Sequence, residues 1–180
     1  MKLLRMKVRS MLVAAFVGML IVAVALPASA APGDTTATVT VEGGSLSITV
    51  PGATAHLGTR ANTVAAGTIS GPLGEVQVLD ARSAAAGSTW TASAISTAFT
   101  GQSPALAATG ISYSAGTIAK VGTATYVANN PGSLVGVAPV VTATGITGDN
   151  SATWTPTITV AVPGGSVAGT YTAVITHSVL

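Results

Sequence analysis

The feature that most constrains this chain is an alternation of apolar and hydroxyl side chains with a period of two residues. The run WTPTITVAV, residues 154–162, is the clearest case, because every second residue is apolar and threonines occupy positions 155, 157 and 159 between them. Such alternation is typical of a β-strand with one face buried. Since no stretch shows the apolar period of an amphipathic helix of three turns, the sequence predicts an all-β protein.

Further alternating runs lie along the chain, at residues 36–41, 45–50, 76–80, 88–96 and 170–179. The EGG sequence of residues 42–44 predicts a turn that joins the first two runs in a hairpin. The loop of residues 163–169, which is rich in glycine, predicts that the last two strands are antiparallel neighbours. The glycine-rich residues 115–137 predict loops with short strands, and residues 104–110 a short helical turn.

Short strands separated by Gly/Pro turns at roughly ten-residue spacing favour a sandwich of two sheets. The predicted fold is a single antiparallel β-sandwich of the immunoglobulin-like or Greek-key type. The chain has no cysteine, so no disulfide bond supports it, and its stability must come from sheet packing.

The N-terminus has the three-part pattern of a secretory signal. Four basic residues precede an apolar run at residues 11–26, and small residues follow, with Ala28 and Ala30 at the spacing that a signal peptidase accepts. We predict a signal peptide at 1–30, a flexible tail at 31–35 and the β-sandwich domain at 36–180. The alternative is an uncleaved membrane anchor, although the apolar run is shorter than the roughly 20 residues that a spanning helix needs. Cleavage predicts a secreted protein at the cell surface, with no membrane contact afterwards.

The basic character of the chain belongs to the predicted signal. Beyond residue 30, three basic residues stand against five acidic residues, a net charge of three minus five, or −2. Nucleic-acid binding needs a basic surface that displaces counterions, so the composition predicts no nucleic-acid partner.

Residues suited to catalysis are scarce and scattered. The two histidines are His56 and His177, no serine lies in a G-x-S-x-G elbow, and no pair of acids suggests a glycosidase. The turn at residues 147–151 holds one acid and one amide, too few oxygens for a convincing calcium site. The sequence therefore predicts a protein that is not an enzyme, with no cofactor and no metal. A small hydrolase built on a chance Ser-His-Asp arrangement is the alternative.

Four ring-bearing residues are the candidates for contact with a ligand: Trp90, Trp154, Tyr171 and His177. Each tryptophan lies in an alternating strand, where it could anchor the core or stack on a sugar ring. Tyr171 lies at the start of the last run and is placed like a corner tyrosine, whose hydroxyl bonds a nearby backbone group. His177 shares its face with apolar residues, where a packing role is more common than ligand binding.

Two stretches resemble the WxL surface domains of Gram-positive bacteria. In residues 76–99, Asp80-Ala81-Arg82 and Trp90-Thr91-Ala92 occupy the places of that family's first signature and its Trp-x-Leu motif. The closing residues 152–180 are similar to the family's final strand pair. Ala92 replaces the leucine of the first motif, and His177-Ser178-Val179 stands in the place of the second.

The resemblance implies a β-sandwich that binds the bacterial cell wall non-covalently, through peptidoglycan or an associated polymer. Trp90, Trp154, Tyr171 and His177 are then the expected wall-binding residues, and other surface proteins are possible additional partners. The alternative function is a structural or adhesin-like subunit that assembles with other surface proteins by β-strand pairing.

Overall fold

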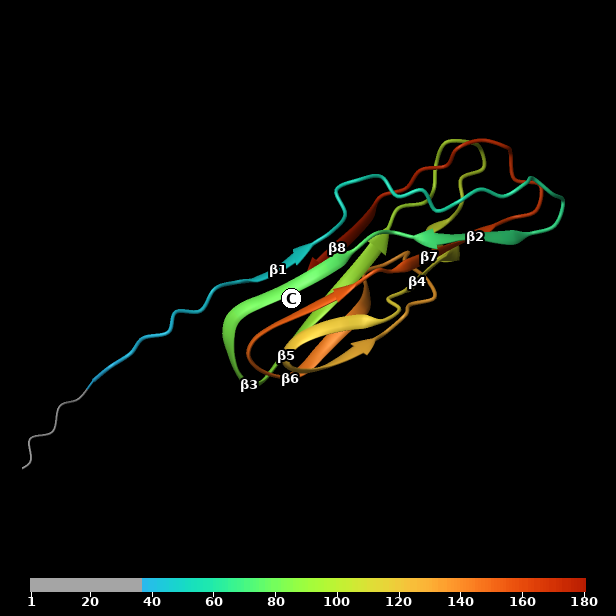
Figure 1. The fold of residues 1–180 in the computed structure, drawn as a ribbon. Coiled ribbons are helices and arrows are strands. Elements are labelled where there is room, and N and C mark those ends of the chain that lie inside the picture. The colour runs from blue at the N-terminus through green and yellow to red at the C-terminus, as the bar shows by residue number, and fades with distance from the viewer. Residues whose placement is uncertain (1–36) are drawn as a thin grey trace, which may run out of the picture. The chain divides into compact units, whose positions relative to one another are not determined.

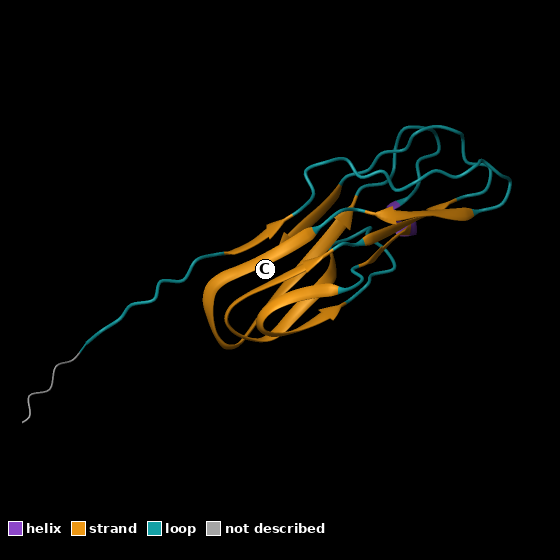
Figure 2. Cartoon of the chain, viewed as in Figure 1, coloured by secondary structure: helices purple, strands orange, loops and turns teal. Residues whose placement is uncertain are grey.

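The computed structural model describes residues 37–180, so the predicted signal peptide and the flexible tail lie outside the described residues. The described part is built of strands in two antiparallel sheets, with one short 3-10 helix (Figure 2). This confirms the prediction of an all-β sandwich. Within residues 37–180, no helix has the length and apolar character to cross a membrane.

The elements follow one another along the chain (Figure 1) as β1 (Leu46–Thr49), β2 (Gly67–Pro72), β3 (Val76–Ser96), the 3-10 helix η1 (Ala108–Gly110), β4 (Ile111–Ser114), β5 (Ile118–Ala128), β6 (Ala138–Trp154), β7 (Thr157–Val162) and β8 (Ile175–Val179). The larger sheet has the order β1-β3-β6-β5, with β8 also paired to β3, and the smaller sheet has the order β2-β7-β4. The helical turn expected at residues 104–110 is present as η1.

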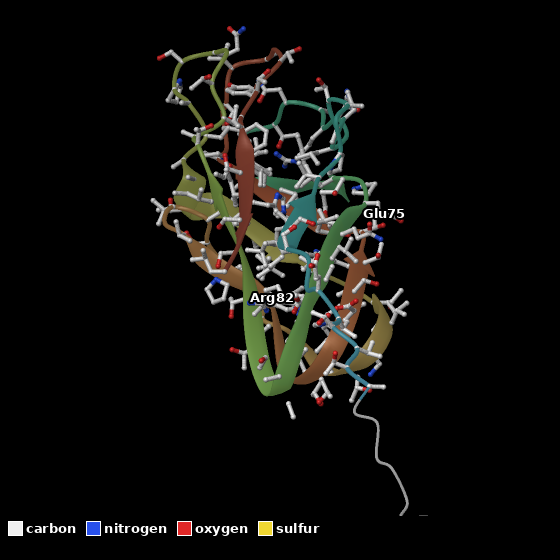
Figure 3. The ribbon with its side chains drawn as sticks, turned by 90° about the vertical axis from the view of Figure 1, so that its left-hand side faces the viewer. Glu75 and Arg82 are labelled. Carbon is white, nitrogen blue, oxygen red and sulfur yellow. The ribbon has the colours of Figure 1, made fainter. Side chains whose placement is uncertain are left out.

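The long strands β3 and β6 organise the larger sheet, and β3 turns back on itself in Figures 1 and 3. Its first arm pairs with the end of β6, from Val76 opposite Trp154, and its second arm pairs with the beginning of β6. The register shifts between the arms, where Ser83 and Gly87 have φ angles of 51° and 87°. A positive φ costs a non-glycine residue free energy, so the bend is a specific local feature. Consequently β1 pairs with one arm and β8 with the other.

The core lies on the faces that the alternation predicts. One buried cluster contains apolar residues from three of the alternating runs: Val76, Val78, Trp90, Ala92, Ala94, Trp154, Ile158 and Val160. The residues between them are mostly exposed or half-buried. Burial of apolar area is worth about 25 cal/mol per Å², so this cluster is the main source of stability in a chain without disulfides.

The hairpin predicted around residues 42–44 is wrong. Residues 37–45 belong to no strand, and β1 pairs with β3 instead. The glycines serve a close approach: a Cβ atom on Gly43 would lie 2.6 Å from the Arg82 carbonyl oxygen, and the Gly44 amide donates to the Ala81 carbonyl. These glycines allow the chain to lie close against β3. The local sequence alone does not distinguish this role from that of a turn.

The closing hairpin is also not formed. β7 pairs with β2 and β4, whereas β8 pairs with β3 in the other sheet. The predicted last strand is shorter than expected, because only residues 175–179 of the run are in β8. Residues 163–174 therefore form a connection between sheets. The central region differs as well, since β5 and β6 form a long antiparallel pair where short strands were expected.

Candidate functional site

The described structure contains a cleft with a volume of about 830 Å³. Two connections without regular strand structure, residues 50–62 and 166–174, supply most of its wall. Apolar side chains from β2, β7 and the connections line it together with polar groups. The charged or titratable side chains in the lining are Arg60, His56, Tyr171 and His177, and no described acidic residue contributes. The cleft is therefore amphipathic and favours a neutral or anionic ligand.

Hydrogen bonds hold the two walls in place. The Arg60 guanidinium donates to the Thr63 hydroxyl and to the Ala65 carbonyl, each at 3.1 Å. The Gly165 amide then donates to the Thr63 carbonyl at 2.9 Å, which joins the two connections. Arg60 has further N–H donors beyond these two bonds. Because the walls are tied to each other, the cleft is largely formed before any ligand binds.

Tyr171 and His177 both line this cleft. The Tyr171 hydroxyl donates to the Val167 carbonyl at 2.8 Å, the local backbone bond expected of a corner tyrosine. His177 is half-buried in β8, and its Nε2 lies 3.3 Å from the Tyr113 hydroxyl. The two rings meet edge to face, with centroids 5.7 Å apart. These two residues are the part of the predicted binding set that a ligand in the cleft could contact.

A short chain of polar contacts links His177 to the core. The Trp154 indole N–H donates to the Tyr113 hydroxyl at 2.7 Å, and that hydroxyl in turn meets His177. Indole nitrogen only donates, so the Tyr113 hydroxyl has its own proton free for His177 Nε2. Burial raises the pKa of Tyr113 to about 12, so the hydroxyl remains protonated. A neutral His177 with its proton on Nδ1 fits this arrangement.

We expect His177 to make the protein less stable in mild acid. Burial lowers the pKa of His177 in the folded state, so below the unfolded value of about 6.5 the unfolded chain binds more protons. The stability from neutral His177 is present above that pH and is lost as the pH falls through the folded pKa. Urea unfolding between pH 7 and pH 5 measures the loss, and His177→Gln should flatten the profile. An unchanged profile in the variant would contradict this assignment.

A second polar cluster lies in the core at the bend of β3 (Figure 3 labels Arg82). The Arg82 guanidinium donates to both carboxylate oxygens of Asp80, at 2.8 and 2.9 Å. The Asn150 amide donates to Asp80 at 3.1 Å, and its oxygen accepts from the Trp90 indole at 3.0 Å and the Tyr126 hydroxyl at 3.1 Å. Asp80, Trp90 and Asn150 are buried, so this cluster joins β3, β5 and β6 from inside.

The charge within this cluster is neutralised locally. Hydrogen bonds from Arg82 lower the pKa of Asp80, against the opposing effect of burial, so the carboxylate stays ionised. Burial and the nearby Asp80 charge raise the pKa of Tyr126, which keeps its hydroxyl a donor. No buried side-chain nitrogen or oxygen of the described residues lacks a partner. The hydrogen bonds of the cluster therefore link β3, β5 and β6 to one another.

The structure places both tryptophans in the core, Trp90 in the polar cluster around Asn150 and Trp154 in the contacts that lead to His177. Trp90 and Trp154 are each almost fully buried, and each indole N–H is already bonded within the protein. Neither ring has a face open to a sugar, so in this conformation both act as core anchors and not as a stacking platform. Of the four predicted binding residues, Tyr171 and His177 come together in the cleft and the two tryptophans do not.

Sequence reasoning missed most of the cleft. Its walls include Leu57, Arg60 and Phe99, none of which lies in a run with a clear period. Arg60 was one usable signal for a binding site in a loop. Of the three basic residues after residue 30, Arg82 and Lys120 lie in strands and Arg60 does not.

No group of three or more His, Asp or Glu side chains in residues 37–180 is placed to hold a metal ion. His56 Nδ1 accepts the Gly58 amide at 3.2 Å, and His177 Nε2 meets Tyr113. Comparisons of the chain with protein-family models, curated proteins and solved structures find no match.

Proposed function

We propose that this chain is a secreted, non-catalytic cell-surface module that binds a bacterial cell-wall polymer, peptidoglycan or an associated polymer, in the cleft between residues 50–62 and 166–174. The observation that carries the proposal is the composition of this cleft: an apolar wall, a rim of hydroxyl and amide groups, and no acidic side chain among the described residues. Wall polymers combine sugar or peptide surfaces of mixed polarity with neutral or anionic groups, which fits such a lining.

The dimensions and the chemistry of the cleft support a polymer ligand. A cleft of about 830 Å³ is in the range of small-molecule sites and would hold a few residues of a longer chain that continues beyond it. Arg60 could donate to a carboxylate or phosphate through its remaining N–H groups. Each contact is modest, so retention at the wall would depend on many polymer segments near the protein.

The contacts of the histidines favour binding over hydrolysis. His56 Nδ1 accepts a backbone amide, and His177 Nε2 is bonded to the Tyr113 hydroxyl. These partners are not serine hydroxyls. General-base catalysis requires a base within hydrogen-bond reach of its nucleophile. The resemblance to WxL domains points to the same non-catalytic role, although both copies of the motif are altered.

Filling the cleft should weaken wall binding. Ala168 lines the cleft and is exposed, so Ala168→Trp would occupy the space of a ligand without disturbing the core. We expect binding to purified sacculi to fall about tenfold or more, equivalent to about 1.4 kcal/mol, measured by co-sedimentation across protein concentrations. Ala85→Trp, at an exposed position in the bend of β3, is the matched control and should bind like the wild type.

If the wild type does not sediment with sacculi at any salt concentration, the wall-binding function is wrong. If both tryptophan variants bind like the wild type, wall binding does not use the cleft.

A further inference from the structure

The segment of residues 37–42, with the sequence ATVTVE, has the composition of a strand but no strand partner. Its valines alternate with threonines, which favours extended pairing. In the described structure it belongs to no strand, and Val39 and Val41 are 88% and 79% exposed. Both valine side chains are therefore in contact with water.

The bend of β3 explains why this segment is left unpaired. β1 pairs with β3 as far as Leu46 opposite Asp80, and the Gly44 amide adds one more bond to Ala81. At Ser83 the backbone of β3 turns with a φ of 51°. The backbone of β3 therefore turns away before it could continue the pairing with residues 40–42, and the described strands that pair with β3 are β1, β6 and β8.

The opposite edge of the same sheet is open. In the order β1-β3-β6-β5, β5 is the last strand and, among the described residues, it pairs with β6 alone. Residues 119–123 of β5 are all exposed, so neither face of this stretch is covered. Lys120 lies here beside Val121, which is 70% exposed. An uncovered edge of this kind is a ready site for an added strand.

We propose that residues 37–42 of one copy of this chain add as an antiparallel strand to β5 of a second copy. Val41 of the donor lies opposite Val121 of the acceptor, and Glu42 lies opposite Lys120. Residues directly opposite in an antiparallel pair place their side chains on the same face. The register thus joins an apolar pair and an ion pair at neighbouring positions.

Charge makes this pairing selective. A lysine at an edge, and the bulge at Gly122 where φ is 87°, both discourage indiscriminate strand addition. An added strand with an acidic residue opposite Lys120 pairs with the lysine charge and lowers the free-energy cost of addition. A strand without an acidic residue there does not. Glu42 is the acid that the chain provides next to its exposed valines.

The positions of donor and acceptor determine the kind of assembly. The donor precedes β1 at one edge of the sheet, and the acceptor is β5 at the other edge. Each copy can then donate at one edge and accept at the other, which is a head-to-tail contact and not a two-fold contact. Such contacts produce open chains or rings, and this would multiply the weak wall contacts of each copy.

Disulfide trapping tests the contact directly, because the chain has no cysteine of its own. Protein produced from the full chain is prepared as V41C and as V121C, and the two are mixed and oxidised. The pairing holds the two thiols together at a high effective concentration, so we expect about tenfold or more cross-linked dimer than from V64C mixed with V121C. Val64 is 98% exposed and lies outside the proposed contact, so it reports random collision.

Charge exchange gives an independent measurement by sedimentation. E42K and K120E should each reduce the oligomers that wild-type protein forms with rising concentration, and the double variant E42K/K120E should restore them. Equal cross-linking of V41C and V64C, or a wild-type monomer at all concentrations, would overturn the inference. These experiments contain no wall polymer, so their failure leaves the proposed wall binding unaffected.

Discussion

Replacement of Trp154 by alanine is expected to lower the free energy of unfolding by about 4 kcal/mol. Trp154 is buried at the end of β6, opposite Val76 of β3 and Ile118 of β5. The change removes a large apolar side chain and leaves a cavity that the two neighbouring strands cannot close. A domain of this size has a stability of about 5–15 kcal/mol, so the variant would be close to unfolding at ordinary temperature. Urea titration followed by circular dichroism measures the change.

Two further variants separate volume from hydrogen bonding at this position. Trp154→Phe keeps a ring in the core but removes the indole N–H that donates to Tyr113, so we expect a loss of about 1–2 kcal/mol. Val64→Ala, at a loop position with an exposed side chain, should change the stability by about 0.5 kcal/mol or less. A Trp154→Ala protein as stable as the Val64→Ala protein would show that Trp154 does not anchor the core.

The same variants distinguish the two predicted roles of the tryptophans. If Trp154 acts in the core alone, folded Trp154→Phe protein should sediment with sacculi like the wild type. A large loss of wall binding in folded Trp154→Phe protein would instead favour a contact between Trp154 and the polymer, in a conformation other than the one described here.

The buried faces were predictable from the sequence because they depend on local geometry alone. In a strand, side chains alternate between the two faces, so Val76, Val78 and Trp90 had to share faces with their apolar neighbours whatever their partner strands were. The fold class followed from the same information. The structure confirms the fold class and places Val76, Val78 and Trp90 in the buried core.

Strand pairing was less predictable because it depends on residues far apart in the chain. The glycines at residues 43 and 44 have the composition of a hairpin turn, but they allow close contact with β3, some forty residues away in the printed sequence. Similarly, residues 163–169 look like a tight loop, but the strands on either side belong to different sheets. The composition of a turn alone does not determine which strands pair with each other.

The cleft and the buried polar cluster were hidden for a related reason. The cleft walls have no period, and a loop's position is set by the strands that carry it. The i, i+2 spacing of Asp80 and Arg82 placed them on one face, but burial of Asp80 depends on Asn150, which reaches it from β6. Only the register of β3 and β6 brings these side chains together.

Asn150 connects this cluster, and its replacement by leucine is expected to cost about 3 kcal/mol of stability. Leucine has nearly the same branched shape, so the packing changes little while both hydrogen-bonding atoms are lost. The Trp90 indole N–H then has no acceptor, and Asp80 loses one of its donors. Urea unfolding measures the effect. Asn129→Leu is the matched control, because Asn129 is exposed and its bond to Thr142 can be replaced by water, so a change of about 0.5 kcal/mol or less is expected.

A double-mutant cycle shows whether the cluster acts as a unit. Trp90→Phe removes the indole N–H that donates to Asn150 Oδ1. In the Asn150→Leu background, the protein then has no buried indole N–H without an acceptor at this position. The two changes together should therefore cost less than the sum of their separate effects, by about 1 kcal/mol. Strict additivity would mean that the 3.0 Å contact contributes nothing to stability.

The pH dependence of stability is a further test of the cluster. The Asp80 pKa is lowered in the folded state, so the stability from its carboxylate is present above the unfolded pKa of about 3.9. This stability is lost as the pH falls below that value and through the folded pKa. Because Asn150 is one of the donors that hold this pKa down, Asn150→Leu should make the loss of stability below that pH smaller.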